Sequence, residues 1–423
     1  MTFHTHRRNV TASFLCFALL IALGLSESTG LGADWPQFRG LNRDGKSPET
    51  GLLKQWPEGG PRLLWSVEDL GHGYTSVAVS NGKLYTTGLE RQTGYLYVYD
   101  LNGNRLWKKS YGPGWSGGHA GTRSTPTLDD GLVYVLSGHG LLSCFDIETK
   151  ERKWMVDIRG KFKARELHWG ITESLLIVDD KIICTPGGKR GAVVALNKKT
   201  GKTVWVCKDI DEASAYCSPI LIERGGRKLV VTMTADHLIG VDAGNGKLLW
   251  KHPHDANYDI HAVSPVYEDG RIYITSGYGG TRGAMLELSK AGSRLMRKWT
   301  DSNLDCHHGG VVVHDGFIYG ASHENAGGKW FCLNLATGKV AGEIDGVGKG
   351  SVAYADGMLY GYDEKGGKVG LIKASPDDFR LVSSFVVEHG SGQWYWAHPS
   401  IAGGRLYIRH GKALMAYDIS AGE

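Results

Sequence analysis

The chain has 423 residues, of which 61 are Gly, 13 Trp and 19 Tyr, and its formal net charge is +4. This length fits one barrel or propeller as well as two or three ordinary domains. Many glycines and aromatic residues with few prolines are typical of short strands joined by tight turns. Because the net charge is small and no long run of like charges occurs, we expect no nucleic-acid partner.

Residues 1–33 are predicted to be a secretory signal peptide. Two arginines precede an apolar stretch over residues 10–25, and a polar, small-residue segment then leads to Ala33. The apolar stretch is short for a membrane span and contains Thr11 and Ser13; a retained anchor helix is the alternative. We therefore expect a periplasmic or extracellular protein with no transmembrane span once the signal is removed.

Six cysteines follow this segment, and none has the spacing of a C-x-x-C metal site. An exported compartment permits disulfides. Cys207 and Cys217 flank one connection and are the favoured pair. The alternative is that the six are small, buried, apolar residues.

Residues 34–60 are predicted to be a lead-in segment, and residues 61–423 a single repeat domain. One unit comprises an apolar strand, a turn, a strand ending near Tyr, a connection, a strand ending in Asp, a turn and Lys-x-x-Trp. The start of the unit occurs eight times, from SVAVSNGKLY to SIAGGRLYI, and its end gives the same count. Repetition of this kind predicts an all-β, eight-bladed β-propeller of four-stranded antiparallel blades.

Each unit supplies strands A to D from the axis outward. Asn-Gly and Asp-Gly pairs between A and B are typical of hairpin turns with positive φ. The Trp of strand D, as in Trp154 and Trp205, is expected to fill the gap between neighbouring blades. Two units have Gly342 and Phe385 in that position.

The last unit ends at its strand C, KALMAYDIS, with no strand D after it. The spare strand covers residues 61–67, precedes the first unit and contains Trp65. We therefore predict that this N-terminal strand completes the last blade and closes the ring.

The motif AxDxxTGKxxW, best represented by residues 195–205, resembles the repeat of the pyrroloquinoline-quinone (PQQ) propeller family. The resemblance extends from about Trp65 to the C-terminus. It implies kinship with quinoprotein alcohol dehydrogenases and with non-catalytic propellers such as the outer-membrane assembly factor BamB. The segment DWPQFRGLNRDG, residues 34–45, resembles one that precedes such propellers in many exported bacterial proteins.

The chain departs from members of this family in four respects. It has no adjacent cysteines, it lacks the length of the dehydrogenases, and no Glu/Asn/Asp calcium set can be matched onto it. It also shows no lipobox, which BamB has. No dehydrogenase catalytic residue is therefore carried over.

The connections from D to A and from B to C are expected on one face of the propeller, and the tight turns on the other. Nearly all histidines beyond residue 33 fall in these connections, together with aromatic residues such as Trp169 and Trp394. The alternative explanation is that tight turns leave little room for His. Because loops on a rigid scaffold commonly bind ligands, we predict that this loop-rich face is the binding face.

Alignment of the eight A strands predicts the residues at the mouth of the central channel. One layer is small and mostly hydroxyl-bearing and is expected to pack about the axis: Ser76, Thr125, Ser174, Ser218, Ser264, Gly310, Ser351 and His398. Two residues earlier lie Tyr74, Arg123, Thr172, Tyr216, Ala262, His308, Lys349 and Trp396. Cations, phenols and an indole together suit a planar or anionic ligand. We predict a ligand site of Tyr74, Arg123, Tyr216, His308, Lys349, Trp396 and His398; a water-lined channel is the alternative.

The run Cys306-His307-His308 contains metal-ligating residue types. Adjacent residues of a strand point to opposite faces, so they are not expected to meet one ion unless another blade supplies a His such as His261 or His119. We therefore predict no metal site and name His307, His308 and His261 as the candidates.

No nucleophile elbow, His-Glu-x-x-His motif or convergent acid–base set occurs, so no catalytic residue and no cofactor are predicted. We expect an exported, non-catalytic, monomeric propeller that binds a cell-envelope protein or a small ligand. The resemblance gives one alternative, a PQQ-dependent oxidoreductase that uses PQQ with calcium and holds PQQ at Arg123, Lys349 and Trp396. The aromatic and His-bearing loops give another, a carbohydrate- or polyanion-binding propeller.

Overall fold

The computed structural model describes residues 1–4, 33–279, 282–323 and 327–422. Residues 5–32, and with them nearly all of the predicted signal peptide 1–33, lie outside the described residues. Residues Leu31–Glu423 form one compact unit. Within the part of the chain that the structure describes, no helix is long and apolar enough to cross a membrane.

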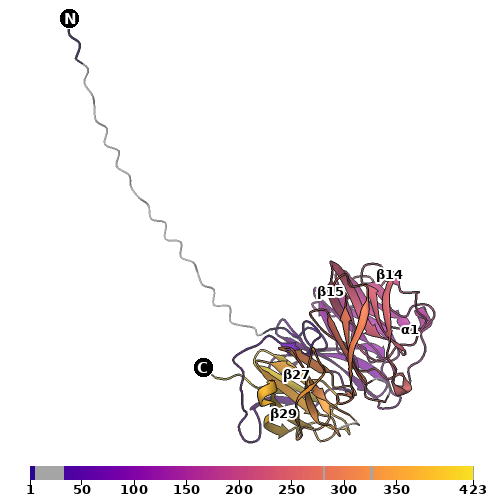
Figure 1. Ribbon diagram of the computed structural model, residues 1–423, viewed down its shortest axis with the longest axis vertical. Helices are drawn as coiled ribbons and strands as arrows, with labels where there is room; N and C mark the ends of the chain where they lie inside the picture. Colours follow the sequence, from indigo (N-terminus) through magenta and orange to yellow (C-terminus); the bar gives the residue numbers. More distant parts are fainter. Residues whose placement is uncertain (5–32, 280–281, 324–326, 423) are drawn as a thin grey trace. The chain divides into compact units, whose positions relative to one another are not determined.

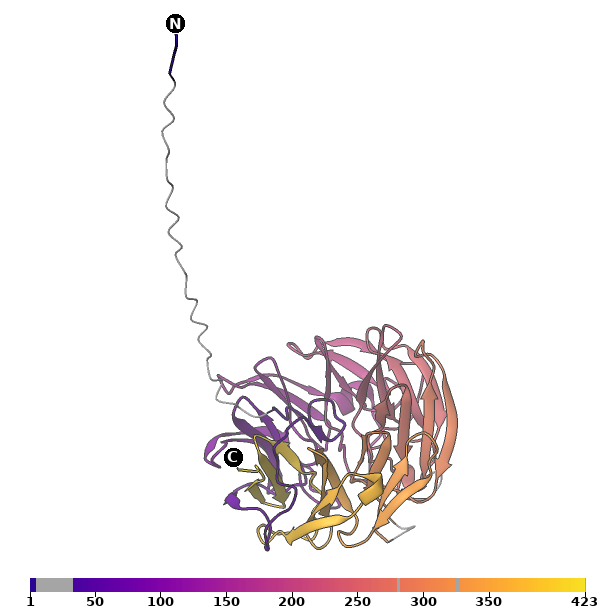
Figure 2. The same cartoon turned by 60° about the vertical axis from the view of Figure 1, so that its left-hand side comes forward.

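Eight antiparallel sheets follow one another in chain order around an axis (Figures 1 and 2), which confirms the predicted propeller. Blades 1 to 4 comprise β3 (Ala78–Ser80), β4 (Lys83–Glu90), β5 (Thr93–Asp100) and β6 (Arg105–Pro113); β7 (Thr127–Asp129), β8 (Leu132–Leu136), β9 (Leu141–Asp146) and β10 (Arg152–Asp157); β11 (Leu176–Val178), β12 (Lys181–Cys184), β13 (Val194–Asn197) and β14 (Thr203–Val206); β15 (Ile220–Arg224), β16 (Arg227–Met233), β17 (His237–Asp242) and β18 (Leu248–Pro253).

Blades 5 to 8 comprise β19 (Val266–Glu268), β20 (Arg271–Thr275), β21 (Gly283–Leu288) and β22 (Leu295–Asp301); β23 (Val311–His314), β24 (Phe317–Ala321), β25 (Trp330–Asn334) and β26 (Val340–Ile344); β27 (Gly350–Ala355), β28 (Met358–Asp363), β29 (Lys368–Lys373) and β30 (Leu381–Val386); β31 (Ser400–Ala402), β32 (Arg405–His410), β33 (Ala413–Asp418) and β2 (Leu63–Val67). The helical segments are α1 (Ile158–Phe162) and the short η1 (Asn257–Asp259) and η2 (Pro376–Asp378).

The last blade is completed by the N-terminal strand, as predicted. Strand β2 pairs antiparallel with β33, with Trp65 opposite Ala416 and Val67 opposite Leu414. In Figure 2 the yellow C-terminal strands accordingly lie beside the indigo and purple N-terminal part of the propeller. This pairing satisfies the outer edge of β33.

The A–B hairpins have the predicted turn chemistry. Asn81 and Gly82 both have positive φ (50° and 70°), as do Asp356 and Gly357 (50° and 78°). Two successive residues with positive φ are the requirement of the hairpin turn whose twist matches that of the strands. The Asn-Gly and Asp-Gly pairs therefore set the register of these strand pairs.

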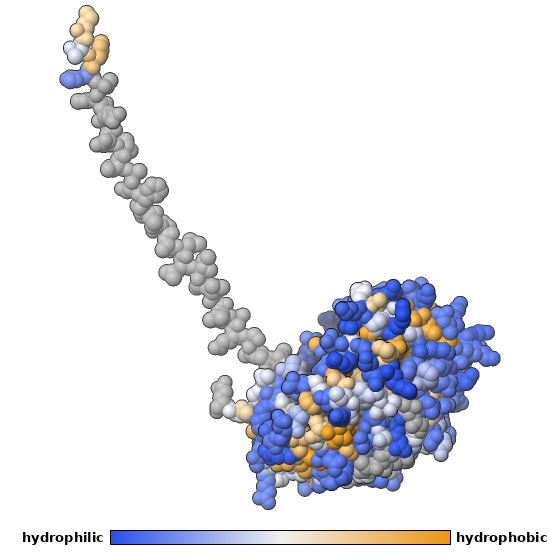
Figure 3. All heavy atoms as spheres, in the orientation of Figure 1, coloured by the Kyte–Doolittle hydropathy of each residue, from blue (hydrophilic) through white to orange (hydrophobic). Residues whose placement is uncertain are grey.

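The core lies between sheets. Ile222 and Leu238 of blade 4, for example, belong to one buried cluster with Ile272 and Leu286 of blade 5. The outer surface in the view of Figure 3 is mainly hydrophilic, with apolar side chains in scattered patches. Each sheet therefore buries its two faces against its neighbours, which a single four-stranded sheet cannot do alone.

The repeated Trp residues connect neighbouring blades through packing and hydrogen bonds. The indole of Trp154 on β10 donates to the carbonyl oxygen of Lys198 in blade 3 (3.1 Å), and that of Trp205 on β14 donates to Ala243 in blade 4 (3.0 Å). Each acceptor lies next to the C–D turn of the following blade. A buried indole N–H needs such a partner, so the Trp is both wedge and hydrogen-bond donor.

The glycine of the C–D turn is explained by the same contact. A Cβ on Gly201 would lie 2.7 Å from the Trp154 ring, and one on Gly246 would lie 2.5 Å from the Trp205 ring. Both glycines also have positive φ (68° and 80°). The Gly-Lys turn of one unit, Thr-Gly-Lys at Gly201 and Asn-Gly-Lys at Gly246, therefore packs directly against the Trp of the preceding unit.

In the two units without this Trp, other aromatic side chains fill the space between the blades. At Gly342 a Cβ would lie 3.0 Å from Phe379, which occupies the space. Phe385 packs at 5.4 Å, ring to ring, against Trp56 of the lead-in segment. Both substitutions thus retain an aromatic ring between the blades.

The lead-in segment packs into the propeller. Strand β1 (Lys46–Ser47) pairs in parallel with β27 and gives that blade a fifth strand, which the sequence did not predict. The guanidinium of Arg39 donates to the carbonyl of Val311 (2.5 Å) in blade 6. Arg43 donates to Ser174 (2.6 Å) in blade 3. Both arginines are buried, so the segment is fixed to two blades that are not neighbours in the ring.

The predicted pairing of Cys207 with Cys217 is wrong. The six described cysteines are buried free thiols. The Cys217 sulfur contacts the Thr232 hydroxyl (3.4 Å) and accepts a hydrogen bond from the Met233 amide (3.2 Å). The alternative, that these cysteines are small buried residues, is confirmed.

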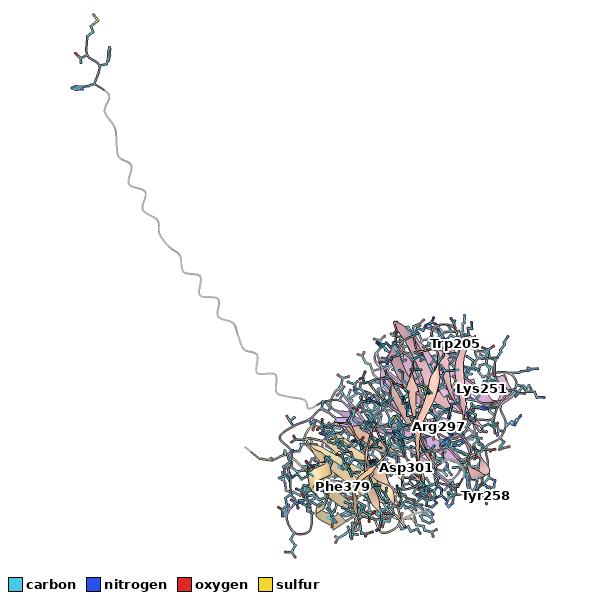
Figure 4. The ribbon with its side chains drawn as sticks, viewed as in Figure 1. Trp205, Lys251, Tyr258, Arg297, Asp301 and Phe379 are labelled. Carbon is cyan, nitrogen blue, oxygen red and sulfur yellow. The ribbon has the colours of Figure 1, made fainter. Side chains whose placement is uncertain are left out.

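Replacing Trp205 (labelled in Figure 4) by Ala is expected to lower the free energy of unfolding by about 3–5 kcal/mol, because it leaves a cavity between blades 3 and 4. Val204→Ala is the control, because this neighbouring side chain is 46% exposed. It should change the free energy of unfolding by less than about 0.5 kcal/mol. Urea unfolding followed by far-UV circular dichroism, and not by tryptophan fluorescence, measures the free energy of unfolding of both variants. Equal effects of the two variants would contradict the wedge role.

Candidate functional site

A cavity of about 450 Å³ lies at the axial end where the A strands begin. The seven residues predicted to form a ligand site all line it: Tyr74, Arg123, Tyr216, His308, Lys349, Trp396 and His398. Thr172 and Ala262, the other two members of the predicted layer that runs from Tyr74 to Trp396, line the cavity as well. The repeat register therefore placed this whole layer around one cavity.

The inner ends of the A strands are joined by hydroxyl side chains. The amide of Ser76 donates to Thr125 Oγ1 (3.2 Å), and the amide of Thr125 donates to Ser174 Oγ (3.0 Å). The Ser174 amide donates in turn to Ser218 Oγ (2.8 Å). The His398 amide donates to Ser76 Oγ (3.0 Å) across the ring closure. These contacts satisfy backbone donors that have no partner in their own blade.

Phe38 of the lead-in segment lines the cavity from below. Its ring meets the His398 ring edge-on at 4.9 Å. Burial, with the nearby Arg39 charge, lowers the pKa of His398 well below its usual value, so this histidine is a neutral part of the floor. The cavity is therefore a pocket with a floor.

One wall has a buried ionic network centred on Glu364. The Lys349 ammonium lies 2.7 Å from Glu364 Oε1, and His308 Nε2 lies 2.7 Å from Oε2. The Trp396 indole also donates to Oε2 (3.2 Å). Burial alone would raise the pKa of Glu364, but the adjacent His307 and His308 rings and the Lys349 ammonium hold it well below its usual range. Glu364 is therefore a buried carboxylate, and it is paired.

Two further histidines contact the same ammonium. Lys349 Nζ donates to His307 Nδ1 (3.1 Å) and to His323 Nδ1 (2.9 Å). His307 Nε2 and the Tyr278 hydroxyl are 2.7 Å apart. Burial lowers the pKa of His307 to about 3, so this ring is neutral at physiological pH and has a lone pair for the ammonium.

The histidine pair behaves differently from the sequence prediction. His307 and His308 lie in an irregular segment, not a strand, so both rings reach Glu364 and the three ligand atoms lie within 4.8 Å of one another. His261, in contrast, is fully buried away from this cluster. It bonds Ser276 Oγ (2.7 Å) and the Ala235 carbonyl (3.0 Å).

The part of the cavity that adjoins this ionic network is aromatic. Trp394 and Trp396 are stacked at 5.2 Å with an interplanar angle of 13°. The His119 ring lies 4.8 Å from Trp396 and 5.2 Å from Trp169, and Tyr74 lies 5.0 Å from Trp396. This arrangement offers flat apolar faces to a planar ligand.

Arg123 connects this wall to the loop that precedes it. Its guanidinium donates to four backbone carbonyls, those of Trp169 (2.9 Å), Gly121 (3.1 Å), Gly118 (2.9 Å) and His119 (2.8 Å). Burial lowers its pKa to about 10, so it remains charged at neutral pH. Arg123 therefore supplies positive charge to the cavity while most of its donors hold loops in place.

Six lining residues escaped the sequence prediction. Tyr278, His323, Glu364 and Lys365 come from B–C connections, Ile260 comes from a D–A connection, and Phe38 comes from the lead-in segment. Only His323 had a signal, because it belongs to the set of histidines in connections. Glu364 stands in a Gly- and Lys-rich stretch that resembles any surface turn.

Comparisons with known proteins give the following similarities. A family model described as outer membrane protein assembly factor BamB matches residues 92–342. A quinoprotein ethanol dehydrogenase of Pseudomonas aeruginosa is 27% identical over 170 residues, which cover 36% of this chain and 27% of the enzyme. BamB of Burkholderia pseudomallei is 24% identical over 233 residues, which cover 53% of this chain and 56% of that protein. The chain thus matches little more than a quarter of the dehydrogenase and about half of the assembly factor.

Among solved structures, BamB from Moraxella catarrhalis superposes with a TM-score of 0.62 at 16% identity, covering 86% of this chain and 98% of that one. At this identity the likeness shows the fold alone.

Glu364→Gln is expected to lower the free energy of unfolding by about 3–5 kcal/mol, because it leaves the Lys349 charge buried without its partner. Glu343→Gln is the matched control, since this carboxylate is 53% exposed and pairs with Lys329 on the surface; its effect should stay below about 1 kcal/mol.

The Glu364 effect should also depend on pH. Because folding lowers the pKa of Glu364, its stabilisation is present above the unfolded pKa near 4.5 and is lost as the pH falls through the folded pKa. The gap between wild type and Glu364→Gln should therefore persist at pH 5 and narrow below pH 4.5. Urea unfolding of both proteins across this pH range tests the prediction. A difference in the free energy of unfolding that grows as the pH falls would contradict a paired, ionised Glu364.

Proposed function

Since the chain belongs to the family described as outer membrane protein assembly factor BamB, a family of PQQ-repeat propellers, we propose that it is an exported, non-catalytic binding propeller whose axial cavity holds a small, planar, anionic ligand. The observation that carries this proposal is the composition of the cavity. The same cavity combines flat aromatic faces with an excess of positive charge.

The charge balance favours an anion. Arg123, Lys349 and Lys365 line the cavity, and Glu364 is the one carboxylate among its described lining residues. Two of the three cations lie within the same wall as Glu364, so the remaining field there is positive. In a concave site with low-dielectric walls this field attracts negative charge more strongly than at a flat surface.

The shape favours a planar molecule of modest size. A volume of about 450 Å³ lies in the range of ordinary small-molecule sites. The parallel Trp394 and Trp396 rings, with Trp169 and His119 beside them, provide stacking surfaces. A rigid aromatic acid meets both requirements, whereas a flexible chain gains little from flat faces.

A PQQ-dependent oxidoreductase is the second candidate, and the similarity to quinoprotein dehydrogenases favours it. PQQ is a planar quinone with several carboxylates, so Trp396 with Lys349 and Lys365 would suit its ring and its charge. When bound, it supplies a two-electron acceptor for the oxidation of an alcohol.

Calcium does not fit the same wall. Ca²⁺ takes six to eight oxygen ligands, chiefly carboxylates and carbonyls. Here one carboxylate, Glu364, is already paired with Lys349 and His308, and the neighbouring ligand atoms are histidine nitrogens. This wall therefore lacks the oxygen ligands that Ca²⁺ requires.

Export and an envelope location belong to the same proposal. The N-terminal sequence has the pattern of a signal peptide, and the matched family is named for a factor of the outer membrane. A protein partner in the cell envelope is compatible with a ligand in the cavity, because the loops around its mouth lie on the same face.

The proposal is tested by thermal unfolding of the purified protein with PQQ alone, calcium alone and both together. PQQ alone should raise the midpoint, and at about a hundred times its dissociation constant it should add roughly 2.7 kcal/mol. Calcium should add nothing further. Dye-coupled alcohol oxidation in the PQQ sample then separates the two candidates, since activity supports the oxidoreductase.

Lys365→Ala should weaken binding of a planar aromatic carboxylate such as PQQ roughly tenfold, because a charge-assisted contact is lost. Lys368→Ala is the matched control, since that ammonium donates to the Gly346 carbonyl (2.9 Å) and does not line the cavity. Isothermal titration measures both variants. Equal affinities, or no binding of any planar acid, would count against an anion site and leave a protein or glycan ligand on the loops.

A further inference from the structure

We propose that His307, His323 and Glu364 form a cage for a divalent transition metal, that the Lys349 ammonium occupies the centre of this cage, and that shortening Lys349 opens it to an ion such as Co²⁺ or Zn²⁺. This inference does not depend on what the cavity binds.

The ammonium sits where a metal would sit. Lys349 Nζ lies 2.7 Å from Glu364 Oε1, 3.1 Å from His307 Nδ1 and 2.9 Å from His323 Nδ1. An ammonium has three N–H donors, and these three acceptors converge on it from three different connections of the propeller. The lysine is therefore enclosed by two imidazole nitrogens and a carboxylate oxygen.

This set of ligand atoms has a definite metal preference. Imidazole nitrogen with one carboxylate suits Zn²⁺ and its neighbours in the first transition series, and three protein ligands leave a fourth position open. All three residues line the cavity, so that fourth position would face it. The same atoms suit Ca²⁺ and Mg²⁺ poorly, because those ions prefer oxygen.

Two of the three ligands, His307 and Glu364, are already oriented by a second contact. Tyr278 Oη bonds His307 Nε2 (2.7 Å), which leaves Nδ1 toward the ammonium. His308 Nε2 and the Trp396 indole bond the other oxygen of Glu364 (2.7 and 3.2 Å). Metal-binding side chains need outer hydrogen bonds of this kind to hold their orientation.

The cage needs a modest contraction to hold a metal. Zn²⁺ binds imidazole nitrogen and carboxylate oxygen at about 2.0–2.2 Å, which is shorter than the three contacts of the ammonium. The His307 and His323 rings are stacked at 4.7 Å with an interplanar angle of 16°. Binding of one ion by both rings therefore requires side-chain rotation that turns the two Nδ1 lone pairs toward a common point. With Lys349 present the space is filled, and the wall carries a fixed positive charge without a metal.

The test is titration of the purified protein with Co²⁺, followed by visible absorption and by metal analysis after dialysis. Lys349→Ala is expected to bind one Co²⁺ per chain with the strong visible bands of a four-coordinate ion, and Zn²⁺ should raise its unfolding midpoint. The wild type should do neither. Lys365→Ala is the matched control: it removes another cation of the cavity, leaves the cage filled, and should bind no Co²⁺.

Second substitutions at the proposed metal ligands test whether these residues bind the ion. Adding His323→Ala or Glu364→Gln to Lys349→Ala should abolish the Co²⁺ bands, whereas adding His252→Ala, in another part of the propeller, should not. Far-UV dichroism confirms folding of each variant. If Lys349→Ala does not fold, Lys349→Ser carries the same expectation.

Two results would overturn the proposal. One is a folded Lys349→Ala protein that binds no Co²⁺, because the three ligands would then not form a cage. The other is stoichiometric Co²⁺ binding by the wild type with the same spectrum, because the ammonium would then not occupy the metal position. Neither result bears on the PQQ titration.

Discussion

The pairing of β2 (Leu63–Val67) with β33 (Ala413–Asp418) is the contact on which the rest of the structure depends. It joins the two ends of the domain within one sheet, so the ring has no free edge between its first and last units. It also brings the Ser76 hydroxyl to the His398 amide, which completes the chain of contacts across that boundary at the axis. Only in a closed ring do the starts of all eight inner strands face one another.

The spacing of the blades around this ring is set by the Trp and Gly of successive units. The indole of Trp205 reaches Ala243 of the next blade only because Gly246 has no side chain. Where the Trp is missing, Phe379 or Trp56 supplies the ring. The scaffold is therefore rigid, and the variable connections above it are free to carry specificity. The lead-in segment adds what a bare ring lacks, since Phe38 gives the central channel a floor.

The cavity combines two surfaces of different chemistry. The Trp394–Trp396 stack is apolar and flat, whereas the Lys349–Glu364 wall is ionic and buried. Trp396 belongs to both, because its ring stacks on Trp394 and its N–H bonds Glu364. A buried ion pair contributes little net stability compared with apolar packing, so its value lies more in fixing the position of a charge. A charge fixed in this way selects among ligands without the need for a metal.

The repeat pattern of the sequence is enough to predict the architecture and one layer of the site. The recurring turn pairs and the AxDxxTGKxxW motif predicted eight blades, the N-terminal closing strand and the wedge role of residues such as Trp205, and the structure confirms each. The same register placed Tyr74 and Lys349 at one cavity. This succeeds because equivalent positions of a repeat occupy equivalent places around the axis.

The tertiary structure alone decided the residues that do not follow the repeat. Glu364 and His323 lie in connections of unlike length, and Phe38 lies outside the repeat, so no alignment of units could bring them together. The convergence of His307 with His308 was missed because an irregular segment does not have the alternation of a strand. The free thiols of Cys207 and Cys217 were likewise undetermined, since spacing along the chain does not give the distance between sulfurs. In each case the deciding quantity is a distance or a local backbone conformation set by tertiary packing, which the repeat pattern of the sequence does not contain.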